Sequence, residues 1–331
     1  MRIGVSFKPM APASEIVRMA RLAEANGIGN VWIGESPILW QELYSTLASI
    51  GCQTTSIHLG TFVTNPAIRD LTLTASAVAT VNDISEGRVE FGIGTGDSAL
   101  RMMGRSPVRV SELESAITFL KALWSGEARE HNGKTVQLKW IDRPRPAIWV
   151  AGMGPRVLHL AGRIADGVIL SPADPSVLEW CLASVREGAE SVGRPMDDIK
   201  VLCTAAVCID RDIRAARDHV RWFPAVVANH VADVIRHGGG GGVPESVKAY
   251  LLPPGIYDWQ RHGRKDATHN AYIEDELVDR ACLIGPPEAI VTKLHELSAI
   301  GVDQVVAQTA DWEDAEHAIT ALGIDVIPRL S

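Results

Sequence analysis

Eight short apolar runs, separated by longer stretches with helical periodicity or by loops, occur along the whole chain. The runs predict strands at 3–7, 31–34, 57–63, 89–93, 147–151, 168–171, 200–209 and 305–307. The helical patterns predict helices at 14–26, 39–52, 71–84, 111–123, 154–165, 175–192 and 311–322. Strands that alternate with helices pair in parallel through right-handed crossovers. The alternation therefore restricts the chain to an α/β fold with a parallel sheet.

Eight regular units favour a closed barrel over the competing arrangement, an open doubly wound sheet. We predict a (β/α)8 TIM barrel, because such barrels are built from eight strand–helix units in one domain. The length of 331 residues suits one barrel of this kind. We therefore expect a single domain over residues 1–331.

Two segments interrupt the alternation of strands and helices. Residues 130–140 predict a small hairpin with Asn132-Gly133 as its turn. Residues 223–273, after the seventh strand, contain the glycine run 238–242 and no regular pattern. This segment falls on the face where barrel enzymes keep their active sites, so it is a candidate lid or substrate-shaping insertion. A passive surface excursion is the alternative.

Composition argues against several classes of partner and location. The net charge of −8, with scattered basic residues, argues against binding of nucleic acid or anionic membranes. No apolar run approaches the roughly 18 residues that cross a bilayer, and the strand-like start is unlike a signal peptide. Five cysteines without a CxxC spacing indicate reduced thiols. We expect a cytoplasmic protein that acts on a small molecule.

Common catalytic and metal-binding motifs are missing from the sequence. The ten histidines form no HExxH pattern. His230 and His237 would share a helix face, but solvated or core-edge histidines are far commoner than ligands, so no metal site is predicted. The sequence also lacks GxxxxGK[ST] and GxSxG, which argues against phosphate-loop NTPase and α/β-hydrolase chemistry.

The fourth predicted strand ends in Gly92-Ile93-Gly94-Thr95-Gly96-Asp97. Glycines let the backbone turn and let a flat ligand approach closely. In a barrel, Asp97 and Glu35, which follows the second strand, would face one cavity, where two carboxylates can divide acid and base roles. The alternatives are that Asp97 caps a short helix and that Glu35 is a hydrogen-bonded structural carboxylate.

The turn Ala151-Gly152-Met153-Gly154-Pro155 leads from the fifth predicted strand directly into a helix. Small residues there leave the first backbone N–H groups open to an anion, which the helix dipole also favours. We interpret the turn as a phosphate cradle. A tight strand–helix turn with proline at the helix start is the alternative.

Taken together, these segments resemble the bacterial luciferase-like superfamily of barrel flavoenzymes. The likeness is to its coenzyme F420-dependent branch, which includes methylenetetrahydromethanopterin reductase and F420-dependent glucose-6-phosphate dehydrogenase. The matching segments are Val31–Glu35, Leu59–Pro66, Ser85–Arg88, Gly92–Asp97, Ala151–Pro155 and Ala161–Gly167.

The resemblance implies a site and roles for its residues. It places a non-prolyl cis peptide at Phe62-Val63 under the deazaflavin ring and puts Asp97 near the reactive ring carbon. It gives Asp97 and Glu35 catalytic roles. The cofactor-binding residues that it implies are Ser36, Thr61, Phe62, Val63, Gly94, Gly96, Gly152, Met153, Gly154, Pro155 and Ser171. One departure is that Ser36 stands where relatives often carry histidine.

The resemblance therefore implies an F420-dependent oxidoreductase that passes a hydride between the deazaflavin and a small organic substrate. An FMN-dependent luciferase-like monooxygenase is the alternative, and a noncatalytic paralogue is a third interpretation. The resemblance also implies a homodimer, with part of the contact made by the helices after the second and third strands.

Overall fold

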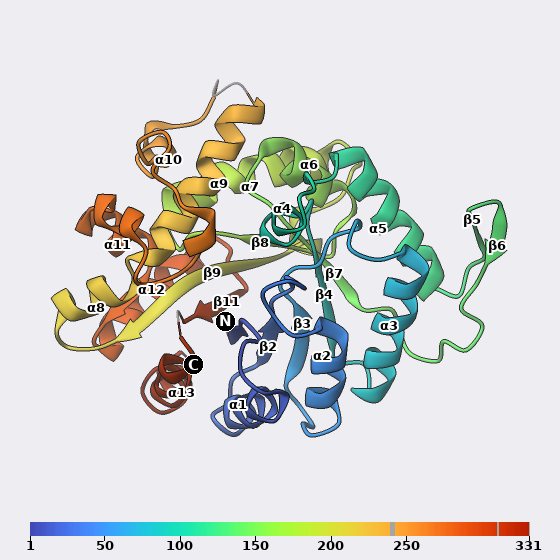
Figure 1. Cartoon of the computed structure of the whole chain (residues 1–331), viewed down its shortest axis with the longest axis horizontal. Helices are drawn as coiled ribbons and strands as arrows, with labels where there is room; N and C mark the ends of the chain where they lie inside the picture. The colour runs from blue at the N-terminus through green and yellow to red at the C-terminus, as the bar shows by residue number, and fades with distance from the viewer. Residues whose placement is uncertain (239–241, 310, 331) are drawn as a thin grey trace.

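The computed structural model describes residues 1–238, 242–309 and 311–330, so most of the glycine run 238–242 lies outside the described residues. Parallel strands close into a barrel in the order β1-β2-β3-β4-β7-β8-β9-β11, and β11 pairs with β1 (Figure 1). They are β1 (Arg2–Phe7), β2 (Asn30–Ile33), β3 (His58–Thr61), β4 (Val89–Ile93), β7 (Ala147–Ala151), β8 (Gly167–Leu170), β9 (Lys200–Ile209) and β11 (Gln304–Gln308). The predicted (β/α)8 barrel is confirmed.

Helices cover the outside of the barrel (Figure 1). They include α1 (Ala13–Ala25), α2 (Leu43–Gly51), α3 (Leu71–Ile84), α5 (Val110–Trp124), α6 (Pro155–Ile164), α7 (Pro175–Glu190), α12 (Pro287–Ala299) and α13 (Trp312–Ala321). No helix in the described part of the chain has both the length and the apolar character needed to cross a membrane.

The predicted start of the second helix at residue 39 is wrong. The amides of Leu39 and Trp40 both donate to the Ser36 carbonyl, which makes a turn instead of a helix. The helix begins at Leu43 because the Glu42 carboxylate accepts a hydrogen bond from the Ser45 amide at 2.7 Å and caps the first turn.

The predicted hairpin is present and projects away from the barrel (Figure 1). It consists of β5 (Arg129–His131) and β6 (Lys134–Val136), so it ends four residues before the predicted end. Asn132 and Gly133 both have positive φ, 50° and 72°, which is the geometry that the right-handed twist of a two-residue hairpin requires.

The excursion between β9 and β11 is longer than the predicted segment 223–273. It contains α8 (Ile213–Val220), α9 (Trp222–Gly238), α10 (Glu245–Lys248), α11 (Asp275–Ala281), β10 (Leu283–Gly285) and α12. β10 pairs with the far end of β9 and stays outside the barrel. Sequence reasoning missed β10 because it has only three residues.

A buried carboxylate ties this excursion to the barrel. Asp174, at the start of α7, accepts hydrogen bonds from the Tyr250 hydroxyl at 2.9 Å and from Arg280 Nε at 3.0 Å. Its other oxygen accepts from the Ser176 amide at 3.0 Å. A buried charge is tolerated where it is paired and fully hydrogen-bonded, so this cluster holds the excursion against the barrel helices.

Two tryptophans fill the interior of the barrel. Trp32 and Trp149 meet edge to face, with ring centroids 6.0 Å apart and planes at 90°. Each ring lies over a glycine of the neighbouring strand. A Cβ at Gly60 would lie 2.1 Å from Trp32 Cε3, and one at Gly167 would lie 2.3 Å from Trp149 Cε3. The two glycines are therefore needed for packing.

We expect Gly60→Ala to destabilise the protein by about 1–3 kcal/mol, the usual cost of overpacking a core. Thermal unfolding followed by circular dichroism measures this. Gly51→Ala, at the end of α2, is the matched control, because its added Cβ would meet neighbours at 3.4 Å, an ordinary contact. Equal unfolding temperatures for Gly60→Ala and the wild type would contradict the packing argument.

Candidate active site

A cavity of about 1330 Å³ opens at the carboxyl-terminal end of the barrel. Each of the eight barrel strands contributes to its lining, either by its own residues or by those directly after it, together with residues of the excursion. Of the predicted site residues, those that line it are Glu35, Phe62, Val63, Gly94, Gly96, Asp97, Gly152, Met153, Gly154, Pro155 and Ser171. This is the end of the barrel where such enzymes carry their active sites.

The cis peptide at Phe62-Val63 is present as predicted. The backbone there bulges toward β4, where the Thr64 amide donates to Gly92 O at 3.1 Å. The Thr61 hydroxyl also donates to Gly92 O, at 2.6 Å. A Cβ at Gly92 would lie 2.2 Å from Thr61 O, so a side chain cannot be accommodated at this position. The bulge and the glycine edge of β4 therefore form one continuous wall of the cavity.

Two predicted cofactor residues, Ser36 and Thr61, do not line the cavity, and both are buried. The Thr61 hydroxyl holds the bulge, as described above, so Thr61 supports the wall without facing the cavity. The Ser36 carbonyl closes the turn before α2.

The glycine turn after β7 has the geometry of a helix start open to the cavity. Gly154 is the N-cap of α6 and Pro155 occupies its first turn. The first amides of a helix have no acceptor within the helix. A Cβ at Gly154 would meet only Val234 Cγ2, at 3.7 Å, so the space beside this turn is open. Arg156 follows and also lines the cavity, which adds a positive charge.

Asp97 follows the glycine edge and stands at the N-cap position of the short helix α4 (Ser98–Met102). Its side chain makes no cap hydrogen bond. Instead, Oδ1 accepts from Arg101 Nε at 2.8 Å, and Oδ2 lies 3.6 Å from His230 Nε2. Burial acts to raise the pKa of Asp97, but His230 and Arg101 outweigh it and lower that pKa to about 2. Asp97 is therefore ionised at neutral pH.

Arg101 joins the barrel to the excursion. Besides Asp97, it donates through Nη2 to Asp233 Oδ2 on α9 at 2.6 Å. Its guanidinium also lies 4.9 Å from the ring centroid of Trp259. This one side chain therefore places α9 and the 259–263 segment relative to the glycine edge.

Glu35 is buried and ion-paired with Arg69, which also binds Glu42 at 2.6 Å. Burial raises the pKa of Glu35, while Arg69 and the Thr64 hydroxyl act in the opposite direction. Its Oε2 is buried and has no hydrogen-bond partner among the described residues. Because Glu35 lines the cavity, this oxygen is available to a bound ligand.

Several lining residues are not among those to which the resemblance gave a catalytic or cofactor-binding role. Lys8 follows β1, donates to Gly263 O at 3.0 Å and lies 4.5 Å from the ring centroid of Trp222. Burial lowers the pKa of Lys8 to about 8. Its position directly after a barrel strand is the sequence feature that points to a place in the active site. His230 and His262, by contrast, come from the excursion, where no periodic pattern pointed to them. No cluster suited to a metal ion occurs among the residues with described positions.

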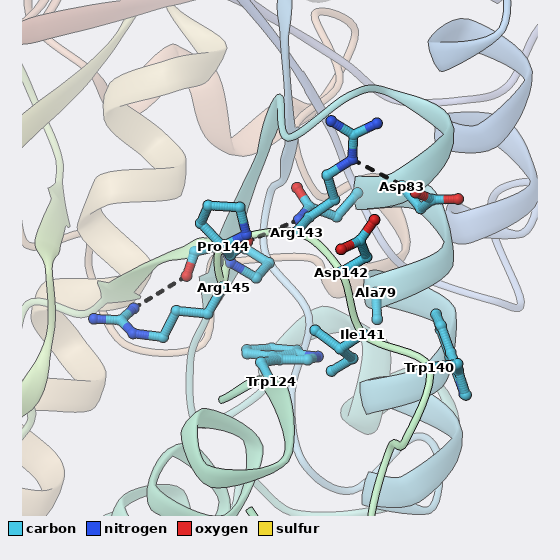
Figure 2. A pocket seen from close by; sticks show the side chains of 11 residues that line it. Ala79, Asp83, Trp124, Trp140, Ile141, Asp142, Arg143, Pro144 and Arg145 are labelled. Carbon is cyan, nitrogen blue, oxygen red and sulfur yellow. Dashed lines mark hydrogen bonds and ion pairs between the residues drawn. The ribbon is translucent and has the colours of Figure 1, made fainter. Parts of the chain in front are cut away.

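A smaller cavity of about 270 Å³ lies between the ends of α3 and α5 and the segment before β7 (Figure 2). Charged and polar groups around it pair with one another. Arg143 Nε lies 3.6 Å from Asp83 Oδ1, and Asn82 Nδ2 donates to Pro144 O at 3.0 Å. It lies near the amino-terminal ends of β4 and β7, the face of a barrel associated with stability. We therefore assign the candidate active site to the larger cavity.

Comparisons with known proteins show which family the chain belongs to. The chain is 30% identical, over 99% of its length and 100% of the relative's, to the 5,10-methylenetetrahydromethanopterin reductase of Methanolobus tindarius. It is 26% identical, over 100% of its length and 99% of the relative's, to the F420-dependent glucose-6-phosphate dehydrogenase of Kribbella flavida.

The fold matches that of the coenzyme F420-dependent tetrahydromethanopterin reductase from Methanopyrus kandleri, with a TM-score of 0.81 at 24% identity, over 100% of this chain and 99% of that one. Residues 1–304 match the sequence model of the family described as luciferase-like monooxygenase. The resemblance seen in the motifs is thus confirmed, and the chain belongs to the luciferase-like monooxygenase family.

Proposed function

We propose that this protein is a coenzyme F420-dependent oxidoreductase that passes a hydride between the deazaflavin and a small organic substrate. The observation that carries the proposal is the wall formed by the Phe62-Val63 bulge and the Gly94–Asp97 edge in one large cavity. The relatives named above, a reductase and an F420-dependent dehydrogenase, support this choice.

The residues present fit a flat cofactor with an anionic end. A Cβ at Gly94 would lie 3.3 Å from Ala151 O and 3.4 Å from Val63 Cγ2, so a larger side chain there would cover the bulge that the glycine leaves bare. The open start of α6 and Arg156 suit a phosphate. The free Glu35 Oε2 can accept a hydrogen bond from the cofactor or substrate. When bound, F420 supplies hydride chemistry; the chain supplies position and charge.

The test of the cofactor is direct titration of the purified protein with F420 and with FMN. We expect F420 to bind and Gly94→Val to weaken its binding about 10- to 100-fold, because the added side chain would fill the space for the ring. Gly51→Ala, outside the cavity, is the control and should bind as the wild type does. Tight FMN binding without F420 binding would favour an FMN-dependent monooxygenase, the activity in the family's description.

We propose that Glu35 acts as a charge fixed by Arg69, with Oε2 offered to the ligand. The raised pKa of Glu35 means that its ionisation opposes folding, so its contribution to stability falls as pH rises above the unfolded value of about 4.3. Arg69 limits this loss by pairing with the carboxylate.

Arg69→Met should therefore make the loss of stability with rising pH steeper, because it leaves a buried charge unpaired, at a cost of about 3–5 kcal/mol once Glu35 is ionised. Unfolding temperatures measured from pH 4.5 to 8 test this. The double variant Glu35→Gln/Arg69→Met is the control and should lose the added pH dependence. Matching pH profiles for the single and double variants would show that the pair does not govern Glu35.

We propose that residues 1–331 act as a single domain in which segment 223–273 shapes the substrate end of the cavity. Residues of this segment and next to it line the cavity, which supports this role. They are Trp222, just before the segment, and Phe223, His230 and His262 within it.

We also propose a cytoplasmic location. The described part of the chain contains five unpaired cysteines, which is in keeping with reduced thiols in that compartment.

We also propose that the protein forms a homodimer through the surface of α2 and α3. Ile38, just before α2, and Leu73, in the first turn of α3, are each 63% exposed. Light scattering should give the mass of two chains for the wild type and of one chain for Ile38→Glu/Leu73→Glu. Ile324→Glu, at an equally exposed residue outside these helices, should stay dimeric. A single-chain mass for the wild type would exclude the dimer.

A further inference from the structure

Two imidazoles, His230 and His262, line the candidate active site, and the proposed function assigns no chemistry to either. His230 stands on α9, and its side chain is 37% exposed. His262 belongs to the 259–263 segment. The groups around the two rings differ.

His230 faces an ionised carboxylate. Its Nε2 lies 3.6 Å from Asp97 Oδ2, and the other oxygen of Asp97 is bound by Arg101 at 2.8 Å. An imidazole can give up and take up a proton, and it is the side chain most often used for this purpose in active sites. The contact therefore places a ring that can carry a proton beside an ionised carboxylate in the cavity.

The other charged groups near His230 are paired with one another. Arg101 is neutralised by two carboxylates, Asp97 and Asp233. Asp233, one turn along α9 from His230, is also paired with Arg236. His262 is held neutral, because burial is the largest of the effects that lower its pKa to about 4. Its Nδ1 lies 2.6 Å from the Tyr257 hydroxyl, which fixes the neutral ring.

We propose that His230 is the proton carrier of this active site, positioned by Asp97, for a substrate with a polarised C=O or C=N bond. The proposal rests on the proposed function. In the reductive direction the substrate carbon would receive the hydride that bound F420 supplies, and its oxygen or nitrogen would receive a ring proton of His230, from the nitrogen that does not face Asp97. The substrate is reduced and the deazaflavin oxidised. The neutral imidazole then regains a proton from solvent, and oxidation of an alcohol or amine runs the same steps backward.

In this assignment Asp97 is a positioning residue. Its carboxylate faces one nitrogen of the His230 ring, orients the ring and stays ionised throughout.

Nuclear magnetic resonance of histidine rings tests the contact between Asp97 and His230 without any cofactor. His230→Gln identifies the His230 signal in the wild-type protein. We expect Asp97→Asn to change the ring chemical shifts of His230, because it removes the charge that lies 3.6 Å from Nε2. His131, which lies 2.9 Å from Asp70 outside the cavity, is the internal control, and its ring chemical shifts should stay as they are. Unchanged His230 shifts in a folded Asp97→Asn variant would overturn the proposal.

Single-turnover kinetics with F420 test the transfer of the proton. The probes are methylenetetrahydromethanopterin with reduced F420, and glucose 6-phosphate with oxidised F420. On the probe that reacts, His230→Gln should slow the reaction about 10²- to 10⁴-fold and change its pH profile, while the Kd for F420 stays within about twofold. His131→Gln should leave both unchanged.

The outcomes separate this proposal from the proposed function. Failure of the wild type to bind F420 would contradict the proposed function, while the resonance measurement would still decide whether Asp97 positions His230. Normal F420 binding with an unchanged rate and pH profile in His230→Gln would overturn the role of His230 alone.

Discussion

The contact between the β3 bulge and β4 at Gly92 is the constraint on which the active end of this barrel depends. The Gly92 carbonyl accepts from both Thr61 Oγ1 and the Thr64 amide, and the missing Cβ lets the two strands come that close. Because β4 is held this way, Gly94 to Asp97 leave the strand along the cavity wall. The flat surface, the open space beside it and the position of the carboxylate all follow from one contact between backbones.

Charge then connects this wall to the excursion that covers it. Arg101 binds Asp97 on the barrel side and Asp233 on α9, so the same guanidinium fixes the acid and the helix that carries His230. Electrostatics and positioning are thus inseparable here: the ion pairs that keep Asp97 ionised also determine which imidazole it faces. Trp259, lying against Arg101, brings the segment with the neutral His262 into the same arrangement.

Much of this could be predicted from the sequence, for reasons that also explain the failures. Apolar runs predicted the barrel strands because buried parallel strands are apolar on both faces, and the residues after those strands included Glu35 and Asp97. The cis bond at Phe62-Val63 came from the family resemblance and not from the residues themselves. The pairing of Glu35 with Arg69 could not be predicted, because it depends on how a loop folds back over the second strand. The role of His230 could not be predicted for the same reason. It depends on the position of α9 above the barrel, which no local pattern encodes.

The bond from Lys8 to Gly263 has a consequence for how such enzymes diverge. It joins the first strand to the excursion, and Lys8 also lies against Trp222 at the start of α9. This part of the cavity is therefore built from two stretches that lie 255 residues apart in the sequence. In a chimera whose excursion came from another family member, Lys8 would no longer face the residues that it contacts here. To transfer specificity within this scaffold, residue 8 must therefore be exchanged together with the inserted segment.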